Sequence, residues 1–335
     1  MARAQAMGRT SLPQSRFNLP GRYAWAAAEL VGPLNMLFIV YTLPALPRSA
    51  DGEDGFNLGF HIPSTLPSSS TTTPSSLNTS LLGTGMPFLY HELMVLLYLL
   101  HYLNRAIITP LFIAPSMSPI AVNVAISMAV FQFINSSCLA SWIVYHPQHQ
   151  PQGESSVSSL FSHKSSSPSP SISLVPLLTG LFIFFLGLWG NISAENTLFR
   201  LRRAAAQRLA KSQGKPMHPS QLSYEKVYVI PDSEEAWFRH IMFPHYAMEW
   251  VEWAGYWIIG GSAGMGWGLG VGIGGATRTE MEAHHRANLG SPALWFLINE
   301  IAAMAPRAVD GLRWYHKRFG KERVARRKAI VPGLL

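Results

Sequence analysis

Long apolar runs alternate with polar connectors along this chain. A membrane-spanning helix needs about 20 mostly apolar residues, and six segments are candidates. They are residues 23–46, 86–113, 119–145, 172–192, 241–276 and 292–304. The fifth is too long for one simple span, and its glycine-rich second half, GGSAGMGWGLGVGIGG, predicts a bend, a re-entrant turn or a split. The sixth is short and bounded by Pro306, which predicts a partly buried helix. The pattern predicts an all-α, multi-pass membrane helical bundle of about six transmembrane segments.

Two connectors have a composition that disfavours a packed core. Residues 47–85 include PSTLPSSSTTTPSSLNTS, and residues 146–170 include SSVSSLFSHKSSSPSP. Such segments bury too little apolar area to offset the entropy of ordering, so we expect flexible loops. The rest divides into a basic N-terminal segment, 1–22, and a single membrane domain, 23–335, which ends in a basic segment, 307–335.

The positions of Lys and Arg orient the bundle. Of the 26 basic residues, 22 lie before the first apolar segment, at the turn around Arg105, or after the fourth and sixth segments. Because cytosolic connectors are enriched in Lys and Arg, both termini are expected in the cytosol. Both Ser/Pro-rich loops then fall on the opposite side, and one of them carries the glycosylation sequon Asn78-Thr79-Ser80.

Composition excludes several classes of protein. Charged residues make up only 13% of the chain and hydrophobic residues 48%, whereas a soluble domain is about one-quarter charged. The single cysteine, Cys138, excludes an intrachain disulfide and any CxxC motif. Basic charge is confined to membrane-proximal segments, which argues against a nucleic-acid partner. The basic, aromatic C-terminal segment instead favours contact with membrane lipid or with a phosphorylated cofactor.

Ionisable side chains inside the apolar runs are the first candidates for function, because burying them in a membrane is costly. Glu29 lies in AWAAAELVGPL, and His101, Tyr102, Asn104 and Arg105 lie together in LHYLNRAIITP. Tyr102 and Arg105 are three residues apart and share a helix face. The alternative is a structural role for both groups. Glu29 would then lie at the level of the lipid headgroups, and the second cluster would form an interfacial belt of aromatic and basic residues.

The end of the fourth apolar segment carries a second polar group. Asn191 and Glu195 are four residues apart in GNISAENTLFRLRR, and Arg202 follows two turns later. This spacing places all three near one helix face. It fits a ligand site, and it also fits an ordinary ion-paired helix end.

The fifth segment opens with FPHYAMEWVEWAGYW, in which His245, Glu249 and Glu252 recur at helical spacing. Two carboxylates and an imidazole on one stripe of a membrane helix are hard to explain by packing. The HExxH arrangement is absent, and the nearest other histidine, His240, precedes a proline, so we expect no metal site. GxGxxG-like matches in the glycine-rich stretch follow no strand and predict no dinucleotide fold.

Four blocks together resemble the steroid 5α-reductase (3-oxo-5α-steroid 4-dehydrogenase) family. They are AWAAAEL, LHYLNRAIITPL, GNISAENTLFRLR and YVIP…HYAMEWVEWAGY…PRAV…RWYHKRFG…RRKAIVP. The resemblance implies a membrane reductase domain of the endoplasmic reticulum that uses NADPH. It implies reduction of a carbon–carbon double bond conjugated to a ketone in a hydrophobic, steroid-like lipid.

The resemblance also assigns roles to individual residues. It implies that Glu29 and Tyr102 hold the substrate carbonyl: Tyr102 donates a hydrogen bond to the developing enolate and Glu29 orients Tyr102. The positions that it implies for NADPH binding are Arg105, Asn191, Glu195, Arg202, Tyr228, His245, Glu249, Arg307 and Tyr315. Arg202 and Arg307 are expected to contact phosphate, and Glu249 and Tyr315 to lie on the nicotinamide side.

Several positions depart from the family pattern. The family usually has seven helices, and this sequence begins in what would be the connector after the first. Glu195 stands where the steroid branch has Asp, and His245 stands where it has Asn. Val229 replaces a basic residue, and Gly311 replaces a His that precedes the tyrosine matching Tyr315. The His245-Tyr246 pair is similar to the polyprenol-reductase branch. The alternatives are a polyprenol or 2-enoyl-CoA reductase, a membrane methyltransferase, and an inactive membrane interaction protein.

Overall fold

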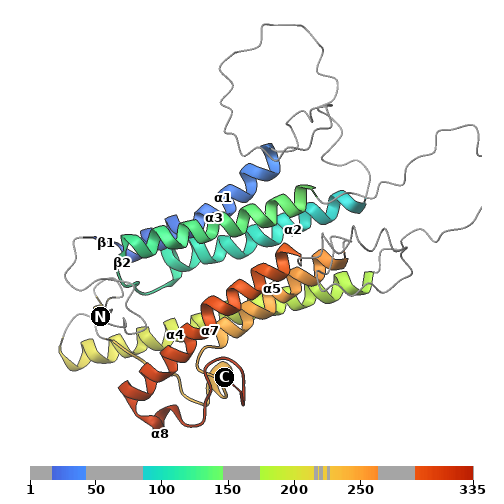
Figure 1. The fold of residues 1–335 in the computed structure, drawn as a ribbon. Coiled ribbons are helices and arrows are strands. Elements are labelled where there is room, and N and C mark those ends of the chain that lie inside the picture. Colours follow the sequence, from blue (N-terminus) through green and yellow to red (C-terminus); the bar gives the residue numbers. More distant parts are fainter. Residues whose placement is uncertain are drawn as a thin grey trace, which may run out of the picture.

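The computed structural model describes residues 17–42, 86–145, 174–214, 218, 222–224, 227–262 and 291–334. Long helices dominate this part of the chain (Figure 1). They are α1 (Gly21–Thr42), α2 (Met86–Tyr102), α3 (Val122–Tyr145), α4 (Leu174–Ser212), α5 (Pro244–Ser262) and α7 (Pro292–Phe319). The short elements are β1 (Asn18–Leu19), the π-helix η2 (Leu103–Ile113), β2 (Ile120–Ala121), the 3₁₀-helix η5 (Ala236–Phe238) and α8 (Lys321–Val324).

The predicted all-α membrane bundle is confirmed, and a long helix occupies each of the six predicted places. Within the described residues, four helical segments are long and apolar enough to cross a membrane. They are Gly21–Thr42, Tyr90–Ile113, Val122–Val144 and Leu174–Ser212. Helices α5 and α7 are not among these four, and each carries buried carboxylates, Glu249 and Glu252 on α5 and Glu300 on α7. The predicted bend of the fifth segment lies in a part of the chain outside the described residues.

The helices form two layers (Figure 1). One layer contains α1, α2 and α3, and the other contains α4, α5 and α7. β1 pairs antiparallel with β2, with Asn18 opposite Ala121, so α1 and α3 begin at the same end of the bundle. The chain returns to that end through α2 and η2. The layers meet where α2 contacts α5 and α3 contacts α7.

The basic N-terminal segment is anchored to this end of the bundle. The Arg22 guanidinium donates hydrogen bonds to the carbonyl oxygens of Ala114 (2.7 Å) and Pro115 (3.0 Å), which follow η2. Residues 1–16, both Ser/Pro-rich loops and the Asn78 sequon lie outside the described residues. The structure therefore neither supports nor opposes the predictions made for them.

Helices α4 and α5 pack backbone to backbone. A Cβ atom at Gly187 of α4 would collide with the backbone of Glu252, and one at Gly255 of α5 would collide with the backbone of Phe184. Small residues permit this approach, which is a common basis of helix association in membranes. The close contact allows the Asn191 amide of α4 to reach Glu249 of α5.

One predicted helix end is wrong. The sixth segment was expected to end before Pro306, but α7 continues through this proline to Phe319. An internal proline costs a helix about 3 kcal/mol, and α7 continues beyond it where Ala308 is buried in a cluster with Ala329 and Ile330. The fourth membrane segment was predicted over residues 172–192 with a helical polar continuation, and α4 extends to Ser212; the stretch RAAAQRLAK is rich in strong helix formers.

The second apolar segment changes its winding after Tyr102. Residues Leu103–Ile113 form the π-helix η2, and the amide of Ala114 donates to the carbonyl of Thr109, five residues earlier. Pro110 lies inside this segment, and it would remove a hydrogen bond from an α-helical ladder and clash with the preceding turn. π-helical turns are rare and are frequent at functional sites. Here the π-helix carries Arg105.

Candidate active site

A buried cluster of polar side chains lies between the two helix layers. The first layer contributes Glu29 from α1, Tyr102 from α2, Arg105 from η2 and further polar groups. The second layer contributes Asn191 from α4 and Glu249 from α5. We call the interacting set the Arg105 cluster, and its members are Glu29, His101, Tyr102, Arg105, Gln132, Asn191, Glu249 and Glu252.

Arg105 is the centre of this cluster and connects the layers. Its Nε atom lies 3.6 Å from Oε1 of Glu29, and its Nη1 atom donates to Oε2 of Glu249 at 3.2 Å. The Asn191 amide donates to the same Glu249 oxygen (3.2 Å) and to the carbonyl of His245 (3.0 Å). The sequence predicted these residues as ligand contacts, and the structure brings them together from four segments far apart in the chain.

A second set of contacts extends the cluster deeper into the bundle. Nδ1 of His101 lies 2.9 Å from Oε1 of Glu252, and Nε2 lies 3.8 Å from Oε1 of Glu249. His101 therefore lies between two carboxylates of α5. Its ring also contacts Tyr102 edge-on, with 5.0 Å between the centroids.

The predicted carbonyl-holding pair lies in the same interior. Tyr102 is 2% exposed and Glu29 is 3% exposed. Oε2 of Glu29 accepts a 2.6 Å hydrogen bond from the Gln132 amide of α3. The described contacts of the Glu29 carboxylate are thus with Gln132 and Arg105, and no hydrogen bond joins it to Tyr102 in this part of the chain. The Tyr102 ring packs against Tyr98, with 4.6 Å between the centroids.

Acidic groups outnumber basic groups in this interior. Glu29, Glu249 and Glu252 face the single guanidinium of Arg105, and Glu300 of α7 is buried within electrostatic range of Glu249 and Arg105. Isolated charges are expensive to bury in a medium of low dielectric constant. The arrangement therefore suits a ligand whose hydrogen-bond donors can bind to these carboxyl groups.

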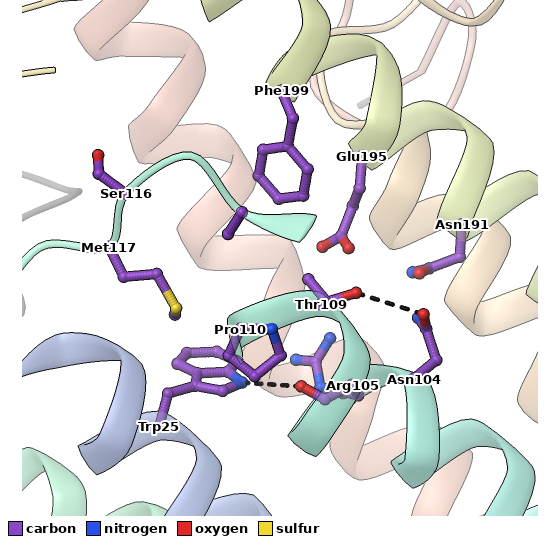
Figure 2. Close-up of a pocket in the computed structure, with 11 residues that line it drawn as sticks. Trp25, Asn104, Arg105, Thr109, Pro110, Ser116, Met117, Asn191, Glu195 and Phe199 are labelled. Carbon is purple, nitrogen blue, oxygen red and sulfur yellow. Dashed lines mark hydrogen bonds between the residues drawn. The ribbon is translucent and has the colours of Figure 1, made fainter. Parts of the chain in front are cut away.

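A pocket of about 160 Å³ adjoins the cluster at the end of the bundle where α1 and α3 begin. Figure 2 shows Arg105, Asn191 and Glu195 directed into it, with Trp25 and Phe199 as aromatic walls. The Trp25 ring lies under the Arg105 guanidinium at 5.4 Å. Small-molecule sites usually measure about 300–1,000 Å³, so this pocket holds only part of a large ligand.

Arg202 lies at the rim of this pocket. It donates to the carbonyl of Ser116, which lines the pocket (3.2 Å), and to the carbonyl of Tyr224 (3.3 Å). Its Nε atom is buried and has no hydrogen-bond partner within the described residues. One donor of the guanidinium is therefore free for an anionic group.

The other predicted residues lie in a separate region. The C-terminal aromatic region consists of Tyr228, Phe243, Trp314, Tyr315, Arg318, Phe319 and Arg327. Tyr228 is half-exposed and contacts Trp314 edge-on, with 5.3 Å between the centroids, and Arg318 lies over the Tyr228 ring at 5.2 Å. The Tyr315 ring contacts Phe243 (6.1 Å) and Phe319 (5.8 Å). No hydrogen bond or ion pair among the described residues connects this region to the Arg105 cluster.

Arg307 and His245 lie between the two regions. Arg307 is exposed and makes no hydrogen bond or ion pair with the described chain, but it is within electrostatic range of Tyr246 and Glu300. The His245 ring contacts Tyr246 at 4.4 Å, and its Nδ1 atom is buried without a described partner. Both residues have polar atoms that remain available to a ligand.

Sequence reasoning did not select four buried polar residues as site residues. They are His101, Gln132, Glu252 and Glu300. Gln132 and Glu300 interrupt the apolar runs MAVFQFIN and LINEIAAM, which is the signal that also singled out Glu29. His101 and Glu252 were noticed for their spacing, but their contact across the layers is visible only in the fold. The described residues contain no group that could hold a metal ion.

Comparisons with known proteins fit this architecture. No protein-family model matches the chain. The chain is 27% identical over 330 residues to an uncharacterized protein of Schizosaccharomyces pombe, covering 96% of this chain and 86% of that protein. It is 25% identical over 241 residues to steroid 5-alpha-reductase DET2 of Arabidopsis thaliana, covering 70% of this chain and 66% of that enzyme. It is also 25% identical over 239 residues to DET2 of Solanum lycopersicum, covering 71% and 66%. The chain is a multi-pass, all-α membrane protein with distant similarity to steroid 5α-reductases.

Proposed function

We propose that this protein is an NADPH-dependent oxidoreductase. It reduces a carbon–carbon double bond conjugated to a ketone in a steroid-like lipid, for example a 3-oxo-Δ4 steroid to its 5α-reduced product. The observation that carries the proposal is the buried bridge Glu29–Arg105–Glu249, with Tyr102 beside it, between two layers of apolar helices. The names of the plant relatives, steroid 5-alpha-reductases, support the same reaction.

Tyr102 and Glu29 serve the substrate carbonyl in this proposal. NADPH, when bound, would supply the hydride that the β-carbon of the enone takes, and an electron pair would then move onto the carbonyl oxygen. The Tyr102 hydroxyl would donate a hydrogen bond to that oxygen, and the α-carbon would take its proton from water. Glu29 is held by Gln132 and Arg105 and fixes the polar end of the site. The dry interior strengthens these interactions relative to water.

The residues around the pocket fit the cofactor. The free Nε donor of buried Arg202 suits a phosphate oxygen, because a guanidinium matches phosphate geometry. Arg105, Asn191 and Glu195 line the pocket, and their donors and acceptors suit the polar groups of a dinucleotide. We assign Arg307 to phosphate and Glu249 to the nicotinamide side. Tyr228, His245 and Tyr315 complete the proposed cofactor residues.

The proposed location is the endoplasmic reticulum membrane, with both termini in the cytosol. The pocket lies at the end of the bundle that carries Arg22, Arg202 and Arg203. Cytosolic loops are enriched in such residues, and a cytosolic pocket has direct access to NADPH. Protease protection of tagged termini in sealed microsomes tests this orientation.

The reaction is tested by NADPH oxidation with the purified, detergent-solubilised protein and a 3-oxo-Δ4 steroid. Glu29→Gln keeps the size of the side chain and removes its charge, and we expect steroid-dependent turnover to fall by about 100-fold or more. Glu92→Gln is the matched control, because Glu92 is exposed on α2, and it should retain wild-type turnover.

Three other results would contradict the proposal in different ways. Binding of S-adenosylmethionine in place of NADPH would identify a methyltransferase. If the protein binds NADPH but turns over only a polyprenol or a 2-enoyl-CoA substrate, it is a reductase of another double-bond substrate and not a steroid reductase. Absence of binding to any dinucleotide would favour a membrane interaction protein.

A further inference from the structure

His101 lies between two carboxylates of α5 and has none of the roles assigned above. It is 3% exposed, and Glu249 and Glu252 are 2% and 0% exposed. Its Nδ1 atom lies 2.9 Å from Oε1 of Glu252, and its Nε2 atom lies 3.8 Å from Oε1 of Glu249. The first distance is a hydrogen bond, and the second is an electrostatic contact. Both ring nitrogens therefore face a buried carboxyl oxygen.

These two contacts determine where the hydrogens of the ring lie. A neutral imidazole has one N–H group and one lone pair, so its lone pair would face an ionised carboxylate whichever nitrogen carries the hydrogen. This repulsion disappears when the pair formed by His101 and Glu252 holds one more proton, either on the ring or on the Glu252 carboxyl group. In both cases the Nε2 atom carries a hydrogen and directs it at Glu249.

Packing limits the rotation of both side chains of this pair. A Cβ atom at Gly187 of α4 would collide with the backbone of Glu252, so the two helices touch at this residue. The Oε2 atom of Glu252 is buried and has no hydrogen-bond partner, which leaves His101 as its polar partner within the described residues. The Trp253 ring lies beside the His101 ring, with 4.7 Å between the centroids, and Tyr102 contacts it edge-on.

Glu249 connects this pair to the pocket. Its Oε2 atom accepts hydrogen bonds from Arg105 and Asn191, both at 3.2 Å, and both of these residues line the pocket. Its Oε1 atom faces His101 and can accept a further hydrogen bond, because a carboxylate oxygen has two lone pairs. One acceptor of Glu249 is therefore held in a fixed orientation and is open to a ligand.

We propose that His101 and Glu252 are positioning residues for the cofactor. By presenting the Nε2 hydrogen to Glu249, they hold its carboxylate so that it accepts a hydrogen bond from the carboxamide group of the nicotinamide. Such supporting contacts matter because a binding residue is precise only when its own rotamer is fixed. The inference rests on the proposed function, because it specifies how the same site recognises its cofactor.

The test compares equilibrium binding of NADPH with binding of its reduced 3-acetylpyridine analogue. The analogue keeps a carbonyl oxygen but has a methyl group in place of the N–H donors. We expect wild type to bind NADPH at least about 10-fold more tightly, since a site that bonds a polar group rejects ligands that lack it. Glu252→Leu should lower this ratio to about 3-fold or less. Glu252→Gln should keep the ratio, because its amide can donate to Nδ1 of His101.

A double variant separates positioning from a purely structural role. His101→Phe combined with Glu252→Leu replaces the pair by apolar side chains, which is often neutral or stabilising. We expect this variant to keep the melting temperature and size-exclusion profile of wild type and to lose the preference for NADPH. Glu92→Leu, at an exposed position of α2, is the matched control and should keep both the stability and the preference.

Steroid turnover is measured on the same preparations. If the folded double variant retains the preference, or if wild type binds both nucleotides equally, the positioning role is overturned and the reductase remains. If the variants lose a preference that wild type shows, but no preparation turns over the steroid, the positioning role is supported and the steroid substrate is contradicted. Failure of folded wild type to bind either nucleotide would overturn both.

Discussion

The Arg105 cluster and the C-terminal aromatic region use similar side chains in opposite ways. In the cluster, Arg105 pairs with Glu29 and Glu249, carboxylates that belong to different helix layers. In the C-terminal region, buried Arg327 donates to backbone carbonyls, including those of Pro231 (2.7 Å) and Val324 (2.9 Å). Arg318 there lies over the ring of Tyr228.

The difference lies in whether the arginines are satisfied by the protein itself. Backbone carbonyls and rings satisfy the arginines of the C-terminal region, and nothing further is required of them. The cluster retains excess carboxylates and unpartnered polar atoms in a medium of low dielectric constant, which is stable only when a ligand or compensating partners are present. Both regions contain buried arginine and aromatic side chains, so residue type does not distinguish them. The interaction partners of these side chains do.

The largest expected effect comes from removing the centre of the cluster. Arg105→Met leaves Glu29 and Glu249 buried without their cation, and we expect a loss of about 3–5 kcal/mol in the free energy of unfolding. Thermal and denaturant unfolding in detergent measure it. Arg313→Met is the control, since the exposed Arg313–Asp310 pair contributes only about 0–1 kcal/mol. Equal losses in both variants would remove the distinction between the regions.

The next effect is on catalysis rather than on stability. Tyr102→Phe deletes only the hydroxyl that we assign to the substrate carbonyl, and we expect kcat to fall by about 10²–10³-fold. NADPH affinity should be unchanged, as measured by equilibrium binding. Tyr90→Phe, at a buried position of the same helix, serves as the control. Full turnover by the Tyr102 variant would refute its assigned role.

The C-terminal region should respond to alkaline pH. Burial raises the pKa of Tyr315 from 10.0 to about 12, so the folded state holds this proton more tightly than the unfolded state. The resulting stability, at most about 2–3 kcal/mol, is complete below pH 10 and is lost as pH rises through about 12. Tyr315→Phe should flatten the melting temperature against pH in this window, whereas the exposed Tyr23→Phe should not. If Tyr315→Phe leaves the dependence of the melting temperature on pH unchanged, Tyr315 is not the group that titrates in this window.

The smallest effect tests the stacked arginine. Arg318→Ala removes the contact over Tyr228, and we expect a loss of about 0.5–1 kcal/mol in unfolding free energy. Lys317→Ala, at the neighbouring exposed position, controls for the loss of surface charge. If Arg318→Ala lowered the free energy of unfolding as much as Arg105→Met, Arg318 would stabilise the protein through more than its contact with Tyr228.

Much of the architecture is readable from apolar run lengths, because a membrane segment must be long, apolar and internally hydrogen-bonded. The six helices begin close to their predicted positions. One helix end was less predictable: Pro306 resembles a break, but α7 continues through it to Phe319. The π-helix at Arg105 also has no clear sequence signal beyond Pro110.

Sequence by itself determined that this is an all-α membrane protein with costly polar groups in its apolar helices, because hydropathy and charge are properties of the chain. Glu29, Tyr102, Asn191 and Glu249 were selected on that basis. Only the tertiary structure decided which groups meet. The pairing of Arg105 with both layers and the contact of His101 with Glu252 depend on helices that are distant in sequence. The physical reason is that contacts between helices depend on how the helix faces are oriented toward one another, and hydropathy along one helix does not determine this orientation.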